Sequence, residues 1–183
     1  MLEKIYKALK GAKVVAMQEK IIPVYKQLKK EGTILVLDTG YSDDMSFEKH
    51  KELIEIADYY TPNIDETEKL TGTRDYKEAL KILGEYFEKP VVKLGKYGCA
   101  GFDGDYFVID NIDEFKCVDA TGAGDAFLSG FIYGLYNDFN FRKCILAGNI
   151  TGGKCVTGVG CLTEYINEKE IEKYLKRYEK LIP

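Results

Sequence analysis

The sequence predicts an α/β fold with a parallel central sheet and an antiparallel hairpin at its later edge. Short apolar runs alternate with stretches of helical periodicity, an order typical of layered α/β proteins. One run, Ile34–Leu37, is apolar throughout, as are strands buried on both faces of a parallel sheet. The dipeptide Asp103-Gly104 between two later runs is a hairpin signal. Because 183 residues suffice for about one such unit, we expect a single α/β domain over residues 1–183.

The predicted strands are short apolar runs bounded by residues that turn the chain or end a helix. Gly32 is expected to end the helix before the second run, and Pro90 opens the fourth. The segment 95–98 contains two glycines and is expected to turn the chain into the fifth run. In chain order, the predicted strands cover residues 14–17, 34–37, 59–61, 91–94, 99–103 and 106–109.

The predicted helices are the stretches of helical periodicity between and after these strands. Pro23 suits the first turns of the second helix, Ser46 is expected to cap the third, and Gly72 to end the fourth. Their predicted extents are residues 2–12, 19–30, 46–57, 65–72, 76–88, 123–136, 141–156 and 168–181.

Composition excludes several classes of protein. Hydrophobic residues make up 45% of the chain and charged residues 31%, as in globular proteins and unlike disordered chains. The formal net charge of −4 gives no overall positive field, so nucleic acid is not an expected partner. The sequence has no apolar run of about 20 residues and its start does not resemble a signal peptide, so we expect a cytoplasmic protein without membrane contact.

The cysteines indicate neither a disulfide framework nor a zinc site. They form no C-x-x-C pair, and the chain contains a single histidine. We therefore expect reduced and mostly buried thiols at Cys99, Cys117, Cys144, Cys155 and Cys161.

The segment Val118–Phe127 carries the clearest chemical signal. Its Gly122-Ala123-Gly124 run lets the backbone turn tightly into a helix, whose free first-turn N–H groups would attract an anion. Asp125, in that first turn, suits a general base for a hydroxyl that attacks a phosphoryl group. The alternative is an ordinary helix start, in which Thr121 is the cap and Asp125 only complements the helix dipole.

The same segment resembles the signature of the ribokinase/PfkB sugar-kinase family, D-[TS]-x-G-A-G-D-x-F-x-x-G. The resemblance implies a Rossmann-like, three-layer ribokinase-type fold and ATP-dependent phosphoryl transfer to a hydroxyl of a sugar. It implies that Asp125 is the base and that Gly122, Ala123 and Gly124 stabilise the transferred charge. The matching positions are Asp119, Thr121, Gly122, Ala123, Gly124, Asp125, Phe127 and Gly130.

Other segments match the family in the same order. Asn63 and Glu66 form its N-x-x-E motif, which implies that Glu66 organises Mg²⁺ through water and that Asn63 lies near the nucleotide phosphates. Such a string is also typical of a capped helix start. Lys93, Gly95 and Gly98 resemble the strand end and turn that meet the phosphates.

The last matching segment resembles the helix and loop that close over the adenosine. It consists of Ala147–Asn149, followed downstream by Thr157 and Gly160, and it implies that Asn149 contributes to the nucleotide site. By the same analogy, the backbone near Asp119, Thr121 and Gly160 is expected to hold a monovalent cation such as K⁺.

Two positions depart from the family pattern. Lys93 stands where a threonine is common and replaces a hydroxyl with a full positive charge, so we expect a phosphate contact, with a structural ion pair as the alternative. Asp38-Thr39-Gly40-Tyr41 lacks the asparagine or arginine that the family tends to have after this strand, so no substrate contact is assigned to it.

The resemblance covers only the C-terminal portion of the family, without its N-terminal sugar-binding and lid part. The implied fold is therefore truncated, and its exposed sheet edge predicts self-association or a complementary N-terminal chain, besides a sugar or sugar-phosphate substrate. The isolated portion is either an active kinase or a non-catalytic nucleotide-binding or interaction module.

A P-loop NTPase is the competing enzyme class, because Gly148–Cys155 nearly matches G-x-x-x-x-G-K-[ST]. Cys155 is a poor ligand for Mg²⁺, however, and the segment is more typical of a helix. His50 lies between two lysines without a visible partner, and we expect it to be solvated.

Overall fold

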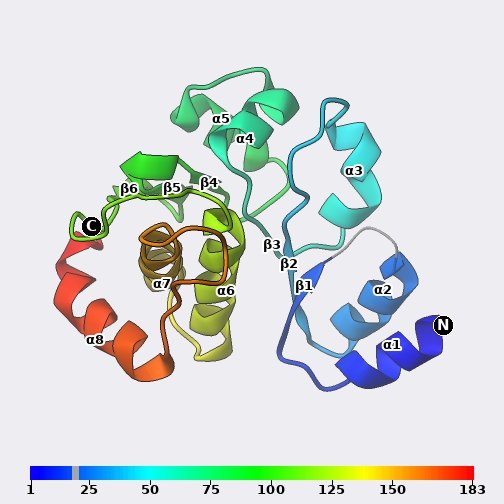
Figure 1. Ribbon diagram of the computed structural model, residues 1–183. Coiled ribbons are helices and arrows are strands. Elements are labelled where there is room, and N and C mark those ends of the chain that lie inside the picture. The colour runs from blue at the N-terminus through cyan, green and yellow to red at the C-terminus, as the bar shows by residue number, and fades with distance from the viewer. Residues whose placement is uncertain (18–20) are drawn as a thin grey trace. The chain divides into compact units, whose positions relative to one another are not determined.

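Two three-stranded sheets form the framework of the computed structural model, within the residues that it describes, 1–17 and 21–183 (Figure 1). The chain divides into two units, Met1–Val92 and Lys93–Pro183. The first sheet belongs to the first unit. The second begins with β4 (Val91–Lys93), whose last residue opens the second unit.

The first sheet is parallel, with strand order β1-β2-β3. β1 (Val14–Met17) pairs with β2 (Ile34–Leu37), and β2 pairs with β3 (Tyr59–Tyr60). Residues 35–37 of the central strand are almost completely buried, so the uninterrupted apolar run does reflect burial on both faces. The parallel sheet predicted from the sequence is confirmed.

Most helices of the first unit end earlier than predicted, although the second ends at residue 30 as predicted. At the start of α3 (Phe47–Ile54), the Ser46 hydroxyl accepts a hydrogen bond from the Lys49 N–H at 3.2 Å. The first helix ends before Gly11, which has a φ of 82°, and the predicted helical residues 19 and 20 lie outside the described residues. The observed helices are α1 (Leu2–Leu9), α2 (Ile22–Lys30), α3 (Phe47–Ile54), α4 (Ile64–Thr71) and α5 (Tyr76–Leu83).

The prediction of a solvated His50 is wrong. Its side chain is 4% exposed, and its Nδ1 lies 3.0 Å from the carbonyl oxygen of Ser46. His50 shares one helix face with Leu53 and Ile54, three and four residues further on, and that face is buried. The neighbouring lysines are exposed because they lie on the other side of the helix.

The predicted hairpin is confirmed in the second sheet. β5 (Cys99–Phe102) and β6 (Tyr106–Ile109) are antiparallel, and Phe102 pairs with Tyr106 across the turn. Gly104 in that turn has a φ of 105°, a conformation that side chains with a Cβ rarely adopt. The second sheet has strand order β4-β5-β6.

Three α-helices follow in the second unit: α6 (Ala123–Tyr136), α7 (Phe141–Cys155) and α8 (Glu168–Tyr178). Figure 1 shows α6 and α7 side by side. They approach closely at Gly130, where a Cβ would lie 2.2 Å from Thr151 Oγ1 and 2.4 Å from the Ala147 carbonyl oxygen. The last predicted helical turn after α8 is a 3-10 helix, Glu179–Leu181.

All the cysteines lie in the described part of the chain and are free thiols. Most of them are buried, as predicted, and two are exposed. The buried ones are Cys99, Cys144 and Cys155, and the exposed ones are Cys117 and Cys161. None of the helices described is both long and apolar enough for a membrane span.

Candidate active site

The start of α6 is an open turn at the segment predicted to bind an anion. Gly122 is the N-cap residue with a φ of 81°, and no side chain in the described part of the chain caps this helix end. Thr121 is therefore not the cap, because its hydroxyl donates to Asp119 Oδ1 at 2.7 Å. Since the first N–H groups of a helix lack intrahelical acceptors and lie at the positive end of its dipole, they can hold an anion.

Gly122 and Gly124 have different structural roles in this turn. A Cβ at Gly122 would lie 2.3 Å from Cys161 Cβ, so both packing and the positive φ require glycine. A Cβ at Gly124 would meet only Lys93 Nζ, at 3.5 Å. Gly124 thus leaves free space above the first turn, and Gly124 and Asp125 are both exposed to solvent. We call residues 122–125 the anion cradle.

Asp119 holds the turn before α6 against the loop after α7. Its Oδ1 accepts from the Thr121 N–H at 2.9 Å, and its Oδ2 accepts from the Gly160 N–H at 2.8 Å. These hydrogen bonds, first that from the Thr121 N–H, hold the pKa of Asp119 below its usual value. The residues predicted to hold a monovalent cation thus lie together, but the Asp119 carboxylate faces N–H and O–H donors.

Lys93 lies beside the anion cradle. Its Nζ is 5.9 Å from the centroid of the Phe127 ring, in the second turn of α6, and close to Gly124 as described above. A cation here adds to the positive end of the helix dipole. The position suits the phosphate contact predicted for this lysine.

The other predicted nucleotide residues of the second unit have structural contacts. A Cβ at Gly98 would lie 2.1 Å from the Ile109 carbonyl oxygen, and Gly95 and Gly98 both have positive φ. Asn149 is buried, and its Nδ2 donates to the Ile109 carbonyl at 2.9 Å. These contacts hold the turn after β4 and the middle of α7 against β6.

The P-loop alternative is wrong. Residues 148–155 all lie within α7 rather than in a loop, and their glycines are buried. A Cβ at Gly153 would lie 2.7 Å from the Phe115 ring, so this glycine serves helix packing. Lys154, the supposed phosphate-binding lysine, instead forms an ion pair with Glu164.

In the first unit, the N-x-x-E residues form a capping box at the start of α4. Asn63 Oδ1 accepts from the N–H groups of Asp65 and Glu66, both at 2.9 Å. Glu66 Oε2 accepts from the Asn63 N–H at 2.7 Å. The Glu66 side chain is 3% exposed, so the cap fixes its carboxylate in one place. The N-x-x-E string therefore forms a capped helix start, as the alternative interpretation predicted.

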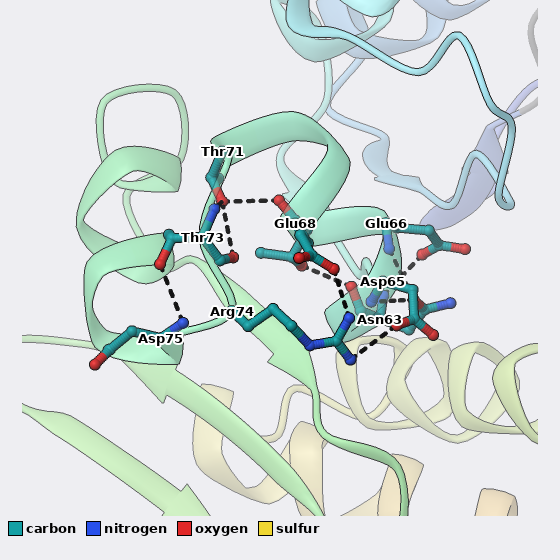
Figure 2. Close-up of polar contacts among 9 residues, drawn as sticks. Asn63, Asp65, Glu66, Glu68, Thr71, Thr73, Arg74 and Asp75 are labelled. Carbon is teal, nitrogen blue, oxygen red and sulfur yellow. Dashed lines mark hydrogen bonds and ion pairs between the residues drawn. The ribbon is translucent and has the colours of Figure 1, made fainter.

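Arg74 neutralises two further carboxylates of α4. Figure 2 shows its guanidinium between Asp65, at 2.9 Å from Nη2, and Glu68, which contacts Nη1. Asp65 and Glu68 are thus paired with Arg74, whereas Glu66 is the buried acid of this helix start.

Polar side chains also meet where β2 and β3 end. Thr61 Oγ1 donates to Asp38 Oδ2 at 3.1 Å, and the hydroxyls of Thr39 and Tyr60 are 2.8 Å apart. Burial raises the pKa of Tyr60, and the negative charges of Glu66 and Asp38 raise it further. Two acids, Asp38 and Glu66, therefore lie near the carboxyl ends of these parallel strands. Ligands of α/β proteins usually bind at this edge of a sheet.

The first unit thus contains the N-x-x-E motif as a capping box, and the second contains the glycine-rich motif as an uncapped helix start. Residues 9–168 match the family profile of pfkB family carbohydrate kinases. The chain belongs to this family.

Relatives of this pfkB chain include named sugar kinases. It is 35% identical over 111 residues to an uncharacterized sugar kinase of Archaeoglobus fulgidus, covering 60% of this chain and 44% of the relative. It is 27% identical to the ribokinase of Lactococcus lactis, covering 97% of this chain and 59% of that enzyme. The structure of Arabidopsis thaliana ribokinase with ribose and ATP matches with a TM-score of 0.82 and 26% identity, over 95% of this chain and 59% of that one. The chain therefore spans about half the length of these relatives.

Sequence reasoning missed three residues that lie near predicted site residues within their own units: Arg74, Tyr60 and Cys161. Arg74 carries a weak signal, a basic residue just beyond an acidic helix. The sequence around Tyr60 predicts only a strand. No neighbouring residue in the sequence predicts that Cys161 packs against Gly122. The last two depend on long-range contacts.

Proposed function

We propose that this chain supplies the nucleotide-binding and catalytic part of a carbohydrate kinase, which transfers the γ-phosphoryl group of ATP to a sugar hydroxyl. The observation that supports it most is the anion cradle, an uncapped helix start with Lys93 at one side and the Asp125 carboxylate in its first turn. A cation and an acid beside one anion site suit phosphoryl transfer to a hydroxyl.

In the proposed reaction, Asp125 accepts the proton of the attacking hydroxyl as its oxygen bonds to phosphorus. The N–H groups of the cradle and the Lys93 ammonium stabilise the negative charge of the transferred group. Asp119 keeps Gly122 in place by tying Thr121 and Gly160 together. Asn149 is proposed to contribute to the nucleotide site through its position in α7.

Magnesium enters this proposal as part of the substrate Mg·ATP, where it neutralises phosphate charge. In the described residues, no group of three or more acidic, histidine or cysteine side chains could hold a metal ion alone. Mg²⁺ typically keeps several waters and binds through phosphates and one or two carboxylates. Glu66 fits this role through water, because its carboxylate supplies hard oxygen ligands and is fixed by the cap, and Asn63 is proposed to lie near the nucleotide phosphates. A monovalent cation at Asp119, Thr121 and Gly160 stays a prediction.

Replacing Lys93 with methionine should weaken binding of Mg·ATP by roughly tenfold or more, because a charge-assisted contact to phosphate is lost. Calorimetric titration of the purified chain measures this. Lys96→Met is the matched control, since Lys96 is an exposed lysine three residues further along the chain and faces the Tyr97 ring. Equal binding by wild type and Lys93→Met would contradict the role of Lys93, and a folded wild type that binds no Mg·ATP would contradict the proposed function.

Replacing Asn63 with alanine should lower the free energy of unfolding by about 1 kcal/mol and also weaken Mg·ATP binding, because Glu66 loses its fixed position. Asp75→Ala is the control: Asp75 caps α5 by accepting from the Lys77 N–H at 2.8 Å and should cost similar stability. Urea unfolding and calorimetry on both variants separate the effects. A parallel loss of binding in Asp75→Ala would show that stability alone is responsible.

A non-catalytic nucleotide-binding module is the second candidate, because the uncapped start of α6 beside Lys93 supports phosphate binding and not transfer by itself. It predicts Mg·ATP binding without phosphoryl transfer to any sugar or sugar phosphate. ATP consumption with a panel of such acceptors distinguishes the two candidates.

A further inference from the structure

Two cysteine side chains flank the glycine that opens the anion cradle. Measured from the Cβ position of Gly122, Cys161 Cβ lies 2.3 Å away and Cys155 Sγ 3.6 Å away. Cys155 Sγ also lies 3.7 Å from the Thr121 carbonyl oxygen and 3.8 Å from that of Cys161. We propose that Cys155 and Cys161 are a redox-active pair, which a peroxide oxidises to a disulfide that reshapes the anion cradle.

The two thiols differ in accessibility, which sets the order of the reaction. Cys161 lies in an exposed loop, whereas Cys155, the last residue of α7, is 2% exposed. A peroxide in solution therefore meets Cys161 first, and Cys155 is the resolving thiol.

The chemistry balances with hydrogen peroxide as the oxidant. The Cys161 thiolate attacks one peroxide oxygen, the O–O bond breaks, and hydroxide leaves to give a sulfenic acid. The Cys155 sulfur then attacks the Cys161 sulfur, the S–O bond breaks, and the oxygen leaves as water with the Cys155 proton. Two thiols are oxidised to one disulfide, and the peroxide is reduced to two waters.

The disulfide would change the anion cradle because the loop that carries Cys161 contacts the residues of the cradle and the turn before it. A disulfide fixes the two Cβ atoms about 3.8 Å apart, so it constrains the Cys161 loop relative to the end of α7. That loop contains Gly160, whose N–H is held by Asp119, and Cys161 packs directly on Gly122. A disulfide at Cys161 therefore also constrains, through these contacts, the turn that presents the first N–H groups of α6.

The first test is chemical and does not depend on nucleotide binding. The full chain is treated with hydrogen peroxide, digested without reduction and mapped by mass spectrometry. We expect a linked Cys155–Cys161 peptide that dithiothreitol reverses, and its loss in Cys161→Ser and Cys155→Ala. Cys117→Ser is the matched control, because Cys117 is the other exposed cysteine, and it should leave the link intact. Overoxidation of Cys161 without a link, or a link through Cys117, would overturn the proposal.

The second test measures whether the disulfide changes the conformation of the anion cradle. Hydrogen exchange at the amides of residues 121–126 should change on oxidation of the wild type and of Cys117→Ser, but not of Cys161→Ser. The consequence for ligand rests on the proposed function: oxidation should weaken Mg·ATP binding by roughly tenfold, a usual size for coupled sites, with recovery on reduction. If the reduced protein binds no Mg·ATP, the proposed function fails while the disulfide and exchange results still decide this inference. A disulfide that leaves exchange at the cradle unchanged would overturn it.

Discussion

Replacing Asp125 with asparagine should lower phosphoryl transfer by roughly 10²–10⁴-fold, the usual contribution of a general base. The amide keeps the size of the side chain but cannot take the proton of the attacking hydroxyl. Mg·ATP binding should be unchanged or tighter, because a negative charge beside the proposed phosphate site is removed. Coupled ATP-consumption assays with sugar acceptors and calorimetry on the same preparation measure the two effects.

Asp138→Asn is the control for this experiment. Asp138 lies just beyond the opposite end of α6 with a φ of 58°, a conformation that asparagine adopts readily. The same chemical change there should leave both transfer and binding unaltered. Transfer by Asp125→Asn at the wild-type rate would reject Asp125 as the base, and a loss of binding of the same size as the loss of transfer would make it a binding residue instead.

Replacing Gly130 with alanine should destabilise the second unit by about 3 kcal/mol, the upper end for overpacking of a core. The added methyl group would lie 2.2 Å from Thr151 Oγ1 and 2.4 Å from the Ala147 carbonyl oxygen, well inside van der Waals contact. A backbone group in a buried helix cannot move aside easily. This outweighs the gain of about 1 kcal/mol in helix propensity from glycine to alanine. Urea unfolding followed by circular dichroism measures the change.

Gly124→Ala in the same helix is the matched control. Its methyl group would meet only the flexible end of Lys93, so stability should be unchanged or slightly raised. The same methyl group occupies the open space of the anion cradle and should weaken Mg·ATP binding. The two variants thus separate the glycine that packs α6 from the glycine that leaves room for a ligand. Equal stability of Gly130→Ala and wild type would refute the packing argument.

Local signals predicted most of the fold because they act within a few residues. Ser46 caps α3, the Asp103-Gly104 turn closes the hairpin, and the uninterrupted run Ile34–Leu37 forms the buried central strand, all as predicted. Helix ends were less accurate. The fifth helix stops at Leu83 rather than at residue 88, because glycine and a short turn follow it.

The candidate site was predictable where one segment contains all of its parts. Residues 122–125 form the anion cradle through backbone conformation alone, and Asn63 and Glu66 form their cap within one helical turn. The P-loop alternative failed for the opposite reason. Its glycines had the spacing of a phosphate loop, and only the neighbouring helix α6 and the Phe115 ring show that they serve packing.

The sequence by itself determined the kinase family, the order of strands and helices and the cradle, because each depends on motifs or on short-range backbone preferences. Tertiary structure alone decided that His50 is buried and that Lys93 lies beside Gly124. It also decided that Cys155 and Cys161 flank Gly122. The physical reason is that these contacts join residues far apart in the chain, whose meeting depends on how helices and loops pack.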